Sequence, residues 1–338
     1  MSAPPGIGAA KGDGGLAVGV DVGGTKVIAG LVDADGSVRR TVRRPTPGRD
    51  VQAVEDTVAA LVTELSDEAD SDVVAVGIGA AGFVDAEQAT VLFSPHLAWR
   101  REPLRDVLQR RLRRPVLVDN DANGAAWAEW RFGAGRGETR LVCLTLGTGI
   151  GGGLVLDGRL ERGRHGLAGE FGHMVLVPGG HRCECGNRGC WEQYASGNAL
   201  GREAREMARA GSPLATDLLA RAGGDPSAIT GNTVTEAARA GDPAAVDLFL
   251  DVGSWLGVGL ANLAAALDPG GFVIGGGVCE AGDLLLRPAR ESFARTLTGR
   301  GFRPAPRIER AALGPLAGLV GMADLARRGV RAGAAARR

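Results

Sequence analysis

Residues 16–32 read LAVGVDVGGTKVIAGLV, in which two apolar runs flank a short polar turn. Apolar runs on both sides of a glycine turn predict a strand, a turn and a second strand. A turn with two glycines lets backbone N–H groups point at an anion without obstruction by a Cβ atom. The segment therefore predicts a phosphate-binding turn, and the alternative is a hairpin with an exposed polar tip. Its candidate residues are Asp21, Gly23, Gly24, Thr25 and Lys26.

The same pattern returns later in the chain. Leu141–Leu146 reads as a strand, Gly147–Gly153 as a glycine turn and Leu154–Leu156 as a returning strand. The turn has more glycines than a hairpin requires, so it is interpreted as a second phosphate-binding turn, with a flexible loop as the alternative. Two strand–glycine turn–strand units predict two similar α/β lobes that face each other across a cleft.

A third glycine cluster, Gly275, Gly276 and Gly277, follows a predicted buried strand that begins at Gly271. Ligands of α/β folds bind at the carboxyl ends of strands, so this cluster is predicted to accommodate a flat nucleotide ring. The alternative is that the glycines only allow close packing.

Apolar residues at helical spacing predict the helices. These include Val51–Leu65, Leu104–Leu112, Ala125–Trp130, Pro243–Leu267 and Leu313–Arg328.

Four polar residues lie between the strand predicted at Pro115–Val118 and the helix predicted at Ala125–Trp130. They are Asp119, Asn120, Asp121 and Asn123. Carboxylates at the carboxyl end of a strand are placed for acid–base chemistry in a cleft. The alternative, capping of the helix N-terminus, would explain one of the four residues but not all of them.

His173, Cys183, Cys185 and Cys190 make a set of one histidine and three cysteines within a short, glycine-containing segment. This is the ligand type of a closed, structural zinc site, and a reduced cluster of buried cysteines is the alternative. Four protein ligands leave no position for a catalytic water. The zinc would therefore fix the loop between Glu170 and Glu192, two carboxylates that suggest recognition of hydroxyl groups.

The composition excludes several classes of protein. The 39 basic and 39 acidic residues give no net charge, which argues against nucleic-acid binding and against a polybasic membrane anchor. The five cysteines in 338 residues are too few for a disulfide scaffold. The first fifteen residues lack the apolar segment of a secretory signal and are expected to be disordered. We therefore expect a cytoplasmic protein.

Together these motifs resemble the ROK family of sugar kinases and repressors, and within it the ATP-dependent glucokinases of actinobacteria. The resemblance runs from about Leu16 to Arg328. It implies the two-lobe actin-like, or ribonuclease-H-like, ATPase fold with a small zinc-binding loop. The implied parts are a disordered extension at residues 1–15, a small lobe at 16–119 joined by the helix at 313–330, a large lobe at 120–312 with the zinc loop at 173–190, and a tail at 331–338.

The resemblance also implies roles for the motifs. Asp121 corresponds to the general base that takes the proton from the sugar 6-hydroxyl. The sugar ligands correspond to Gly82, Asn120, Asp121, Glu170, His173 and Glu192, with His173 also on zinc. The residues around ATP and Mg²⁺ correspond to Asp21, Gly23, Gly24, Thr25, Lys26, Gly147, Thr148, Gly149, Gly275, Gly276 and Gly277. Many family members carry Pro-Gly where this chain has Ala81 and Gly82, so this loop is expected to be less stiff.

The predicted activity is transfer of the ATP γ-phosphoryl group to the 6-hydroxyl of glucose by a homodimer or homotetramer. Kinases for mannose, fructose, N-acetylmannosamine or N-acetylglucosamine are alternatives, as is polyphosphate as the donor. A sugar-responsive repressor is disfavoured, because about fifteen residues before the first strand are too few for a DNA-binding domain. A sugar-binding protein without catalytic activity is a further alternative.

Overall fold

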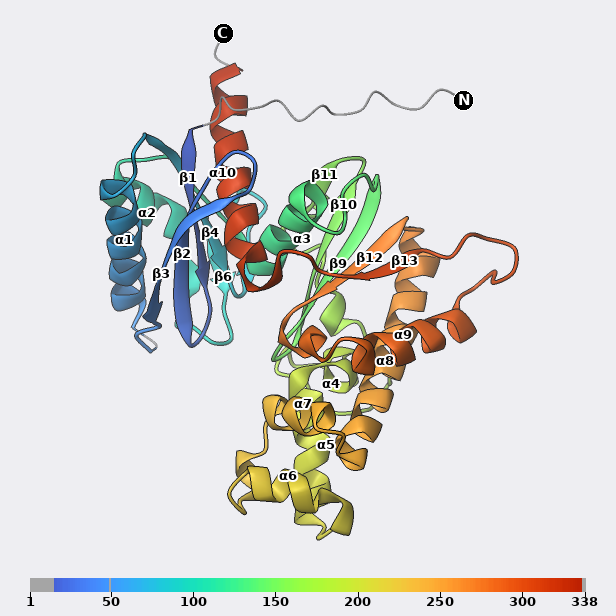
Figure 1. The fold of residues 1–338 in the computed structure, drawn as a ribbon. Coiled ribbons are helices and arrows are strands. Elements are labelled where there is room, and N and C mark those ends of the chain that lie inside the picture. Colours follow the sequence, from blue (N-terminus) through green and yellow to red (C-terminus); the bar gives the residue numbers. More distant parts are fainter. Residues whose placement is uncertain (1–14, 49, 336–338) are drawn as a thin grey trace. The chain divides into compact units, whose positions relative to one another are not determined.

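The computed structural model describes residues 15–48 and 50–335. The chain forms two compact units (Figure 1). Unit 1 contains the residues up to Gly124 and those from Gly318 onward, and unit 2 contains Ala125–Ala317. The division falls within a helix after Gly124, whereas the sequence placed it after residue 119. The predicted disordered extension, apart from Gly15, lies outside the described residues.

Unit 1 is built on a five-stranded sheet in the order β3-β2-β1-β4-β8. Strands β1 and β2 form the predicted antiparallel hairpin, β3 continues it, and β4 and β8 run parallel to β1. Asp21 on β1 pairs with Gly79 on β4, which pairs in turn with Asp119 on β8, so the carboxyl ends of three strands meet at one edge. The strands are β1 (Leu16–Val22), β2 (Lys26–Val32), β3 (Val38–Pro45), β4 (Val73–Ala80) and β8 (Val116–Asn120).

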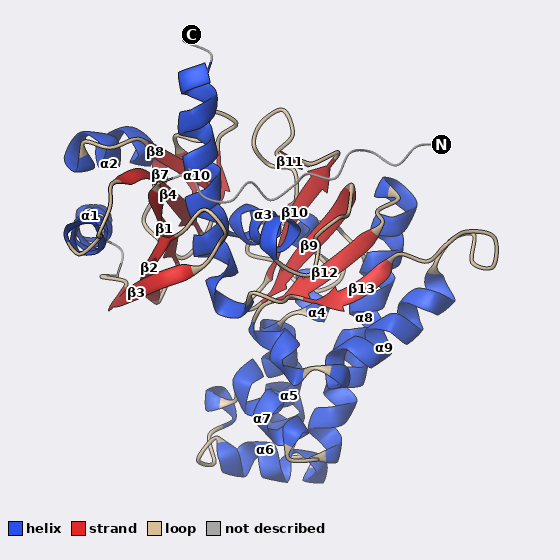
Figure 2. Ribbon diagram, turned by 45° about the horizontal axis from the view of Figure 1, so that its top comes forward, coloured by secondary structure: helices blue, strands red, loops and turns tan. Residues whose placement is uncertain are grey.

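Helices cover both faces of this sheet (Figure 2). Helices α1 (Val51–Asp67) and α2 (Leu104–Leu112) lie on one face, and α10 (Ala317–Ala335) lies on the other. Two glycines of the sheet, Gly19 and Gly77, let the backbone of α10 come into direct contact with the strands, since a Cβ atom at either would overlap the helix carbonyls. Three short strands, which the sequence did not predict, form a second sheet. They are β5 (Phe83–Val84), β6 (Val91–Phe93) and β7 (Arg100–Glu102).

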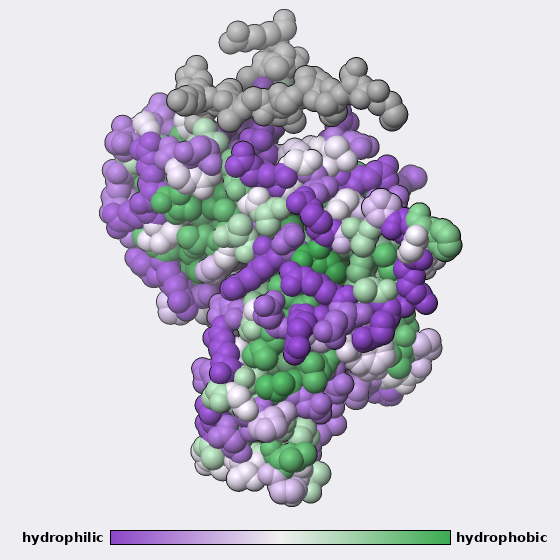
Figure 3. Space-filling view, turned by 45° about the vertical axis from the view of Figure 1, so that its right-hand side comes forward, coloured by the Kyte–Doolittle hydropathy of each residue, from purple (hydrophilic) through white to green (hydrophobic). Residues whose placement is uncertain are grey.

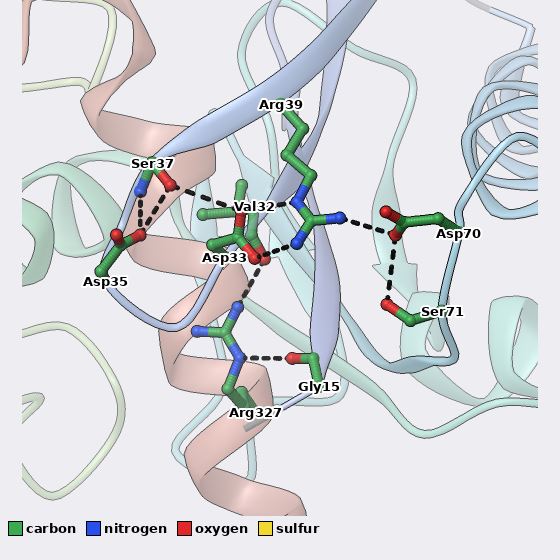
Figure 4. A network of polar contacts seen from close by, with 9 residues as sticks. All are labelled: Gly15, Val32, Asp33, Asp35, Ser37, Arg39, Asp70, Ser71 and Arg327. Carbon is green, nitrogen blue, oxygen red and sulfur yellow. Dashed lines mark hydrogen bonds and ion pairs between the residues drawn. The ribbon is translucent and has the colours of Figure 1, made fainter. Parts of the chain in front are cut away.

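Arg327 connects α10 to the amino-terminal strands through hydrogen bonds (Figure 4). Arg327 is 2% exposed, and its side chain donates hydrogen bonds to the carbonyls of Gly15 and Val32 at 3.0 and 2.7 Å. Asp324, equally buried, pairs with the Arg327 guanidinium at 3.3 Å. The burial of this charge is compensated by carbonyl and carboxylate acceptors, so α10 forms part of the core of unit 1.

Glu55 on α1 is a buried carboxylate that lies 3.2 Å from Arg111 and near Glu102. Burial, followed by the charge of Glu102, raises the pKa of Glu55 from its ordinary value of 4.5 to about 7. The folded protein therefore holds this proton more tightly than the unfolded chain, and the stabilisation is lost as the pH rises toward about 7. We expect the midpoint of thermal unfolding to fall between about pH 5 and about pH 7.

The fall in the midpoint of thermal unfolding with rising pH should be smaller in Glu55→Gln, since this variant has no titrating carboxyl group at position 55. Glu64→Gln on the same helix removes a partly exposed carboxylate and serves as the control. Calorimetry of the three proteins across this pH range measures the effect. Parallel curves for the wild type and Glu55→Gln would contradict it.

Unit 2 repeats the sheet topology of unit 1, with the order β11-β10-β9-β12-β13. Strands β9, β10 and β11 are antiparallel neighbours, and β12 and β13 run parallel to β9. The two similar α/β parts predicted from the repeated pattern are therefore confirmed. The strands are β9 (Arg140–Leu146), β10 (Ile150–Leu156), β11 (Arg159–Glu161), β12 (Gly271–Gly275) and β13 (Arg307–Arg310).

Helix α8 (Pro243–Leu267) is the longest element of unit 2, and its bounds match the prediction. It is long and apolar enough to cross a membrane, but 61% of its most apolar window is buried within the structure. Gly257 and Gly259 let it approach Ala289 and the Trp191 ring closely, as expected for a core helix. On the face shown in Figure 3, hydrophilic residues interrupt the apolar ones and no continuous apolar band is visible among the described residues.

Most of the other helices of unit 2 contribute buried residues to one apolar core with α8. Helix α3 crosses from unit 1 into unit 2. The helices are α3 (Asp121–Phe132), α4 (Glu192–Ala195), α5 (Gly197–Arg209), α6 (Thr216–Arg221), α7 (Gly231–Arg239) and α9 (Asp283–Thr296), with short 3₁₀ helices at Phe171–His173, Pro213–Ala215, Pro226–Ala228, Gly277–Ala281 and Gly314–Leu316.

Three predicted boundaries were wrong. Helix α3 begins at Asp121 and not at Ala125, because Asn120 caps it. The second glycine turn ends at Gly149, since the following glycines belong to β10. Helix α10 continues to Ala335, so the predicted tail is helical as far as the structure describes it.

Candidate functional site

The turn between β1 and β2 is held from two sides. The Gly23 N–H donates to the Lys26 carbonyl at 3.0 Å, which closes the turn. Thr46, just beyond β3, donates its hydroxyl to the Gly23 carbonyl at 2.7 Å and its N–H to the Thr25 carbonyl at 3.1 Å. Hydrogen bonds therefore anchor the turn, while Gly24 and Thr25 at its tip are exposed, so phosphate binding by this turn stays a prediction beside the alternative of an exposed polar tip. Thr46 had no signal in the sequence that would have marked it.

Two carboxylates, Asp21 and Asp121, lie at the same edge of the unit 1 sheet. A Cβ atom on Gly318 of α10 would be 3.7 Å from the Asp21 carboxylate and 3.8 Å from the Asp121 carbonyl. Asp121 also packs against Gly79, the residue that pairs with Asp21. Burial raises the pKa of Asp21, and the charge of Lys26 partly offsets that rise. A site rich in negative charge is suited to binding a divalent cation.

The segment Asp119–Asn123 combines residues that serve the fold with one further carboxylate. Asn120 is the cap of α3, because its Oδ1 accepts the N–H groups of Ala122 and Asn123 at 2.9 and 3.2 Å. Asp119 is 2% exposed and accepts hydrogen bonds from Asn120, Asn123 and Gln88. Capping thus accounts for one residue, as the alternative interpretation allowed, and Asp119 serves the fold. Asp121, in the first turn of α3, is a half-buried carboxylate.

Asn120 also connects the start of α3 with the loop after β4. Its Nδ2 donates to the Gly82 carbonyl at 3.0 Å. Gly82 has a φ of +156°, and a side chain there would overlap the backbone at Phe93 and Ser94. The structure therefore brings Gly82, Asn120 and Asp121 together within unit 1, although two hydrogen-bonding atoms of Asn120 already have partners.

In unit 2, the four predicted metal ligands form one cluster. The ligand atoms of His173, Cys183, Cys185 and Cys190 all lie within 4.8 Å of one another. The sulfurs of Cys185 and Cys190 are 3.6 Å apart, and Cys183 Sγ is 3.6 Å from His173 Nδ1. A tetrahedron of ligands around zinc has edges of about 3.8 Å, so the donor set and its spacing both fit this metal. Such separations are too long for disulfide bonds.

Glu170 and Glu192 flank the metal cluster. Glu192 Oε1 lies 3.5 Å from His173 Nδ1 and 3.0 Å from Cys183 Sγ, and Glu170 Oε2 lies 3.9 Å from His173 Nε2. Burial, and then the charge of Glu192, raises the pKa of Glu170 to about 7. Two carboxyl groups beside an imidazole offer both donors and acceptors, which is what recognition of sugar hydroxyls requires.

Glu192 also contacts the second glycine turn. Its Oε2 accepts the Ile150 N–H at 3.4 Å and approaches Gly149 so closely that a side chain there would displace it. The start of α5 holds the same turn, because the N–H groups of Gly197 and Asn198 donate to the carbonyls of Gly147 and Thr148. The candidate phosphate turn, sugar ligand and metal cluster of unit 2 are thus contiguous.

The third glycine cluster lies at the carboxyl end of β12, as predicted. Gly276 has a φ of +87° and lies against the backbone of Leu146, where a Cβ atom would overlap it. Packing therefore explains Gly276. Gly277 has open space around its Cα atom, and it begins a short 3₁₀ helix.

Comparison with known proteins identifies the family of this chain. The profile of the ROK family matches residues 17–329. The chain belongs to the ROK family.

Three relatives of this ROK chain are particularly informative. It is 48% identical over 313 residues to a glucokinase of Streptomyces coelicolor, covering 93% of this chain and 98% of the relative. It is 51% identical to a ROK glucokinase of Streptomyces griseus whose structure contains glucose and AMPPNP, with a TM-score of 0.86 over 93% of this chain and all of that one. A ROK hexokinase of Thermus thermophilus is 37% identical, with a TM-score of 0.79 over 94% of this chain and 99% of that one.

The predicted site residues of the ROK chain fall into two groups. Unit 1 carries the turn at residues 21–26, Gly82 and the pair Asn120 and Asp121, whereas unit 2 carries the remaining sugar, nucleotide and metal candidates. Within each unit, the structure brings the members close together. Sequence reasoning missed Gln88, which supports Asp119, because a single glutamine in a loop has no distinguishing pattern.

Proposed function

We propose that this ROK protein is an ATP-dependent glucokinase that transfers the γ-phosphoryl group to the 6-hydroxyl of glucose. The observation that carries the proposal is its similarity, over nearly the whole of both chains, to the glucokinase of Streptomyces griseus that binds glucose and AMPPNP. The half-buried carboxylate Asp121, which lies near Asp21 at the end of the strand before the anchored glycine turn, supports it.

Asp121 is the general base in this proposal. Its carboxylate accepts the proton of the sugar 6-hydroxyl as the oxygen attacks the terminal phosphorus of ATP, and ADP leaves. Help from a general base contributes about 10²–10⁴-fold to the rate. Asp121 stands in the first turn of α3, where Asn120 caps the helix and fixes its direction.

The glycine turns hold the nucleotide. Backbone N–H groups at Gly23–Thr25 and Gly147–Gly149 are assigned to the phosphates, and Gly275–Gly277 to the adenosine. Phosphoryl transfer depends more on position and charge neutralisation than on covalent chemistry, so the anchoring of these turns is the relevant property. Mg²⁺ would neutralise charge on the terminal phosphates, and we assign Asp21 as the residue that would hold it.

The remaining ligands recognise the sugar. Gly82 and Asn120 from unit 1, and Glu170, His173 and Glu192 from unit 2, are assigned to its hydroxyls. We further assign Zn²⁺ to His173, Cys183, Cys185 and Cys190. His173 would hold Zn²⁺ through one ring nitrogen, and the N–H of its other ring nitrogen would then be a hydrogen-bond donor for a sugar oxygen or for Glu170.

A coupled assay with a panel of hexoses and with ATP or polyphosphate as donor tests the assignment of substrate. We expect glucose and ATP to give the highest kcat/KM. A higher kcat/KM for mannose, fructose or an N-acetylated hexosamine would make the protein a kinase for that sugar with the same mechanism. Turnover with polyphosphate alone would exclude ATP as the donor. The proposal includes a cytoplasmic location and assembly into a homodimer or homotetramer. Sedimentation of the purified protein measures the oligomeric state.

A further inference from the structure

We propose that His96 binds the phosphoryl group that is transferred, as a hydrogen-bond donor on the glycine turn of unit 1. This inference rests on the proposed kinase function and adds a residue that the motifs did not identify. His96 lies in the loop between β6 and β7, far in sequence from the turn at Gly23–Thr25. A Cβ atom on Gly24 would lie only 2.8 Å from His96 Cβ and 3.5 Å from His96 Cγ, so the histidine side chain begins directly beside this turn.

The loop that carries His96 is firmly held. Ser94, fully buried, donates its hydroxyl to the Ala81 carbonyl at 2.6 Å and accepts the Leu97 N–H at 3.3 Å. Arg100 donates from Nη1 to the carbonyls of Ser94, Leu97 and Trp99 at 2.7, 3.1 and 2.7 Å. Leu97 and Trp99 are buried on either side of the loop's end. His96 is an exposed residue in this otherwise anchored segment.

Continuous contacts join this loop to the proposed general base. Ser94 bonds to Ala81, the residue before Gly82, and the Gly82 carbonyl accepts from Asn120, which caps the helix that begins with Asp121. His96, the glycine turn and Asp121 are therefore fixed parts of one unit. A phosphoryl group held by the turn would therefore lie on the part of unit 1 from which the His96 side chain starts.

The charges at this edge give the imidazole a role. The carboxylates of Asp21 and Asp121 repel the phosphoryl oxygens, and Lys26 supplies a positive charge at the end of the turn. Histidine has an N–H donor in both its neutral and its cationic forms. A hydrogen bond from it would offset part of the repulsion without competing with Asp121 for the proton of the hydroxyl.

Binding of glucose and of glucose 6-phosphate, measured separately by calorimetry without nucleotide, tests this role. We expect His96→Ala to weaken binding of glucose 6-phosphate about tenfold or more and to leave glucose binding unchanged, because a hydrogen bond to a charged group is lost. The variant kcat should fall while the KM for glucose stays near the wild-type value. Gln and Asn each retain a side-chain N–H, so His96→Gln or His96→Asn should restore part of the affinity for glucose 6-phosphate and part of kcat.

Arg101→Ala, an exposed position in the same segment, is the matched control and should behave as the wild type. An equal loss of affinity for glucose and glucose 6-phosphate, or no change in either, would overturn the assignment of His96. A wild-type protein that phosphorylates no hexose would instead remove the proposed function itself. If another hexose proves to be the substrate, that sugar and its 6-phosphate replace the glucose pair.

Discussion

Asp121→Asn is expected to lower kcat by about 10²–10⁴-fold, because the amide cannot accept the proton of the sugar hydroxyl. Glucose binding should persist, since the amide has nearly the shape of the carboxylate and Asn120 still caps α3. Steady-state kinetics together with glucose titration by calorimetry measures the two effects separately.

Asp106→Asn provides the control for this variant. Asp106 is also an acidic residue in the first turn of a helix of unit 1, so any general cost of removing charge from such a position is matched. It is exposed and lies on α2, and the assay should not detect its loss. An Asp121→Asn protein that retained more than about a tenth of the wild-type kcat would show that Asp121 is not the base.

Removal of one zinc ligand should have the second large effect. In Cys185→Ala we expect the zinc content to fall from about one atom per chain to near zero, because three ligands do not close the tetrahedron. The midpoint of thermal unfolding should drop, since metal binding contributes to the free energy of folding. Glucose affinity should also fall, because His173 and Glu192 lose the support that orients them.

Cys279→Ala is the control for the zinc experiment. Cys279 is a buried cysteine of unit 2 that lies outside the cluster, so its removal tests the loss of a thiol without the loss of a ligand. This variant should retain the metal. Elemental analysis of wild-type protein that found no zinc, or Cys185→Ala protein with undiminished zinc, would refute the structural metal site.

Much of the fold follows from local patterns in the chain. The hairpin at residues 16–32 was predictable because valine-rich runs flank a turn with two glycines. The bounds of α8 were predictable for two reasons. Asp242 and Pro243 mark its start, and the apolar run of the helix ends before the polar residue Asp268. The cluster of His173, Cys183, Cys185 and Cys190 was predictable from the residue types and their close spacing, because one histidine and three cysteines are a typical ligand set for zinc.

Other features depend on contacts that no local pattern reveals. The glycines of β10 were predicted as a turn, but Gly152 lies in a strand because the backbone of Gly169 and the ring of Phe171 pack directly on it. The strands β5, β6 and β7 have only two or three residues, which is too short for an alternating pattern to appear. The contact between His96 and Gly24 joins segments that are distant in sequence, so only the folded structure exposes it.

Identification of the product formed from ATP and glucose tests the central claim most directly. We expect phosphorus NMR of a mixture with the zinc-loaded wild-type protein to show ADP and glucose 6-phosphate in equal amounts. The same mixture with Asp121→Asn should show almost no product over the same period. Failure of the folded, zinc-loaded wild-type protein to phosphorylate glucose, or a product that carries phosphate on a different hydroxyl, would contradict the account.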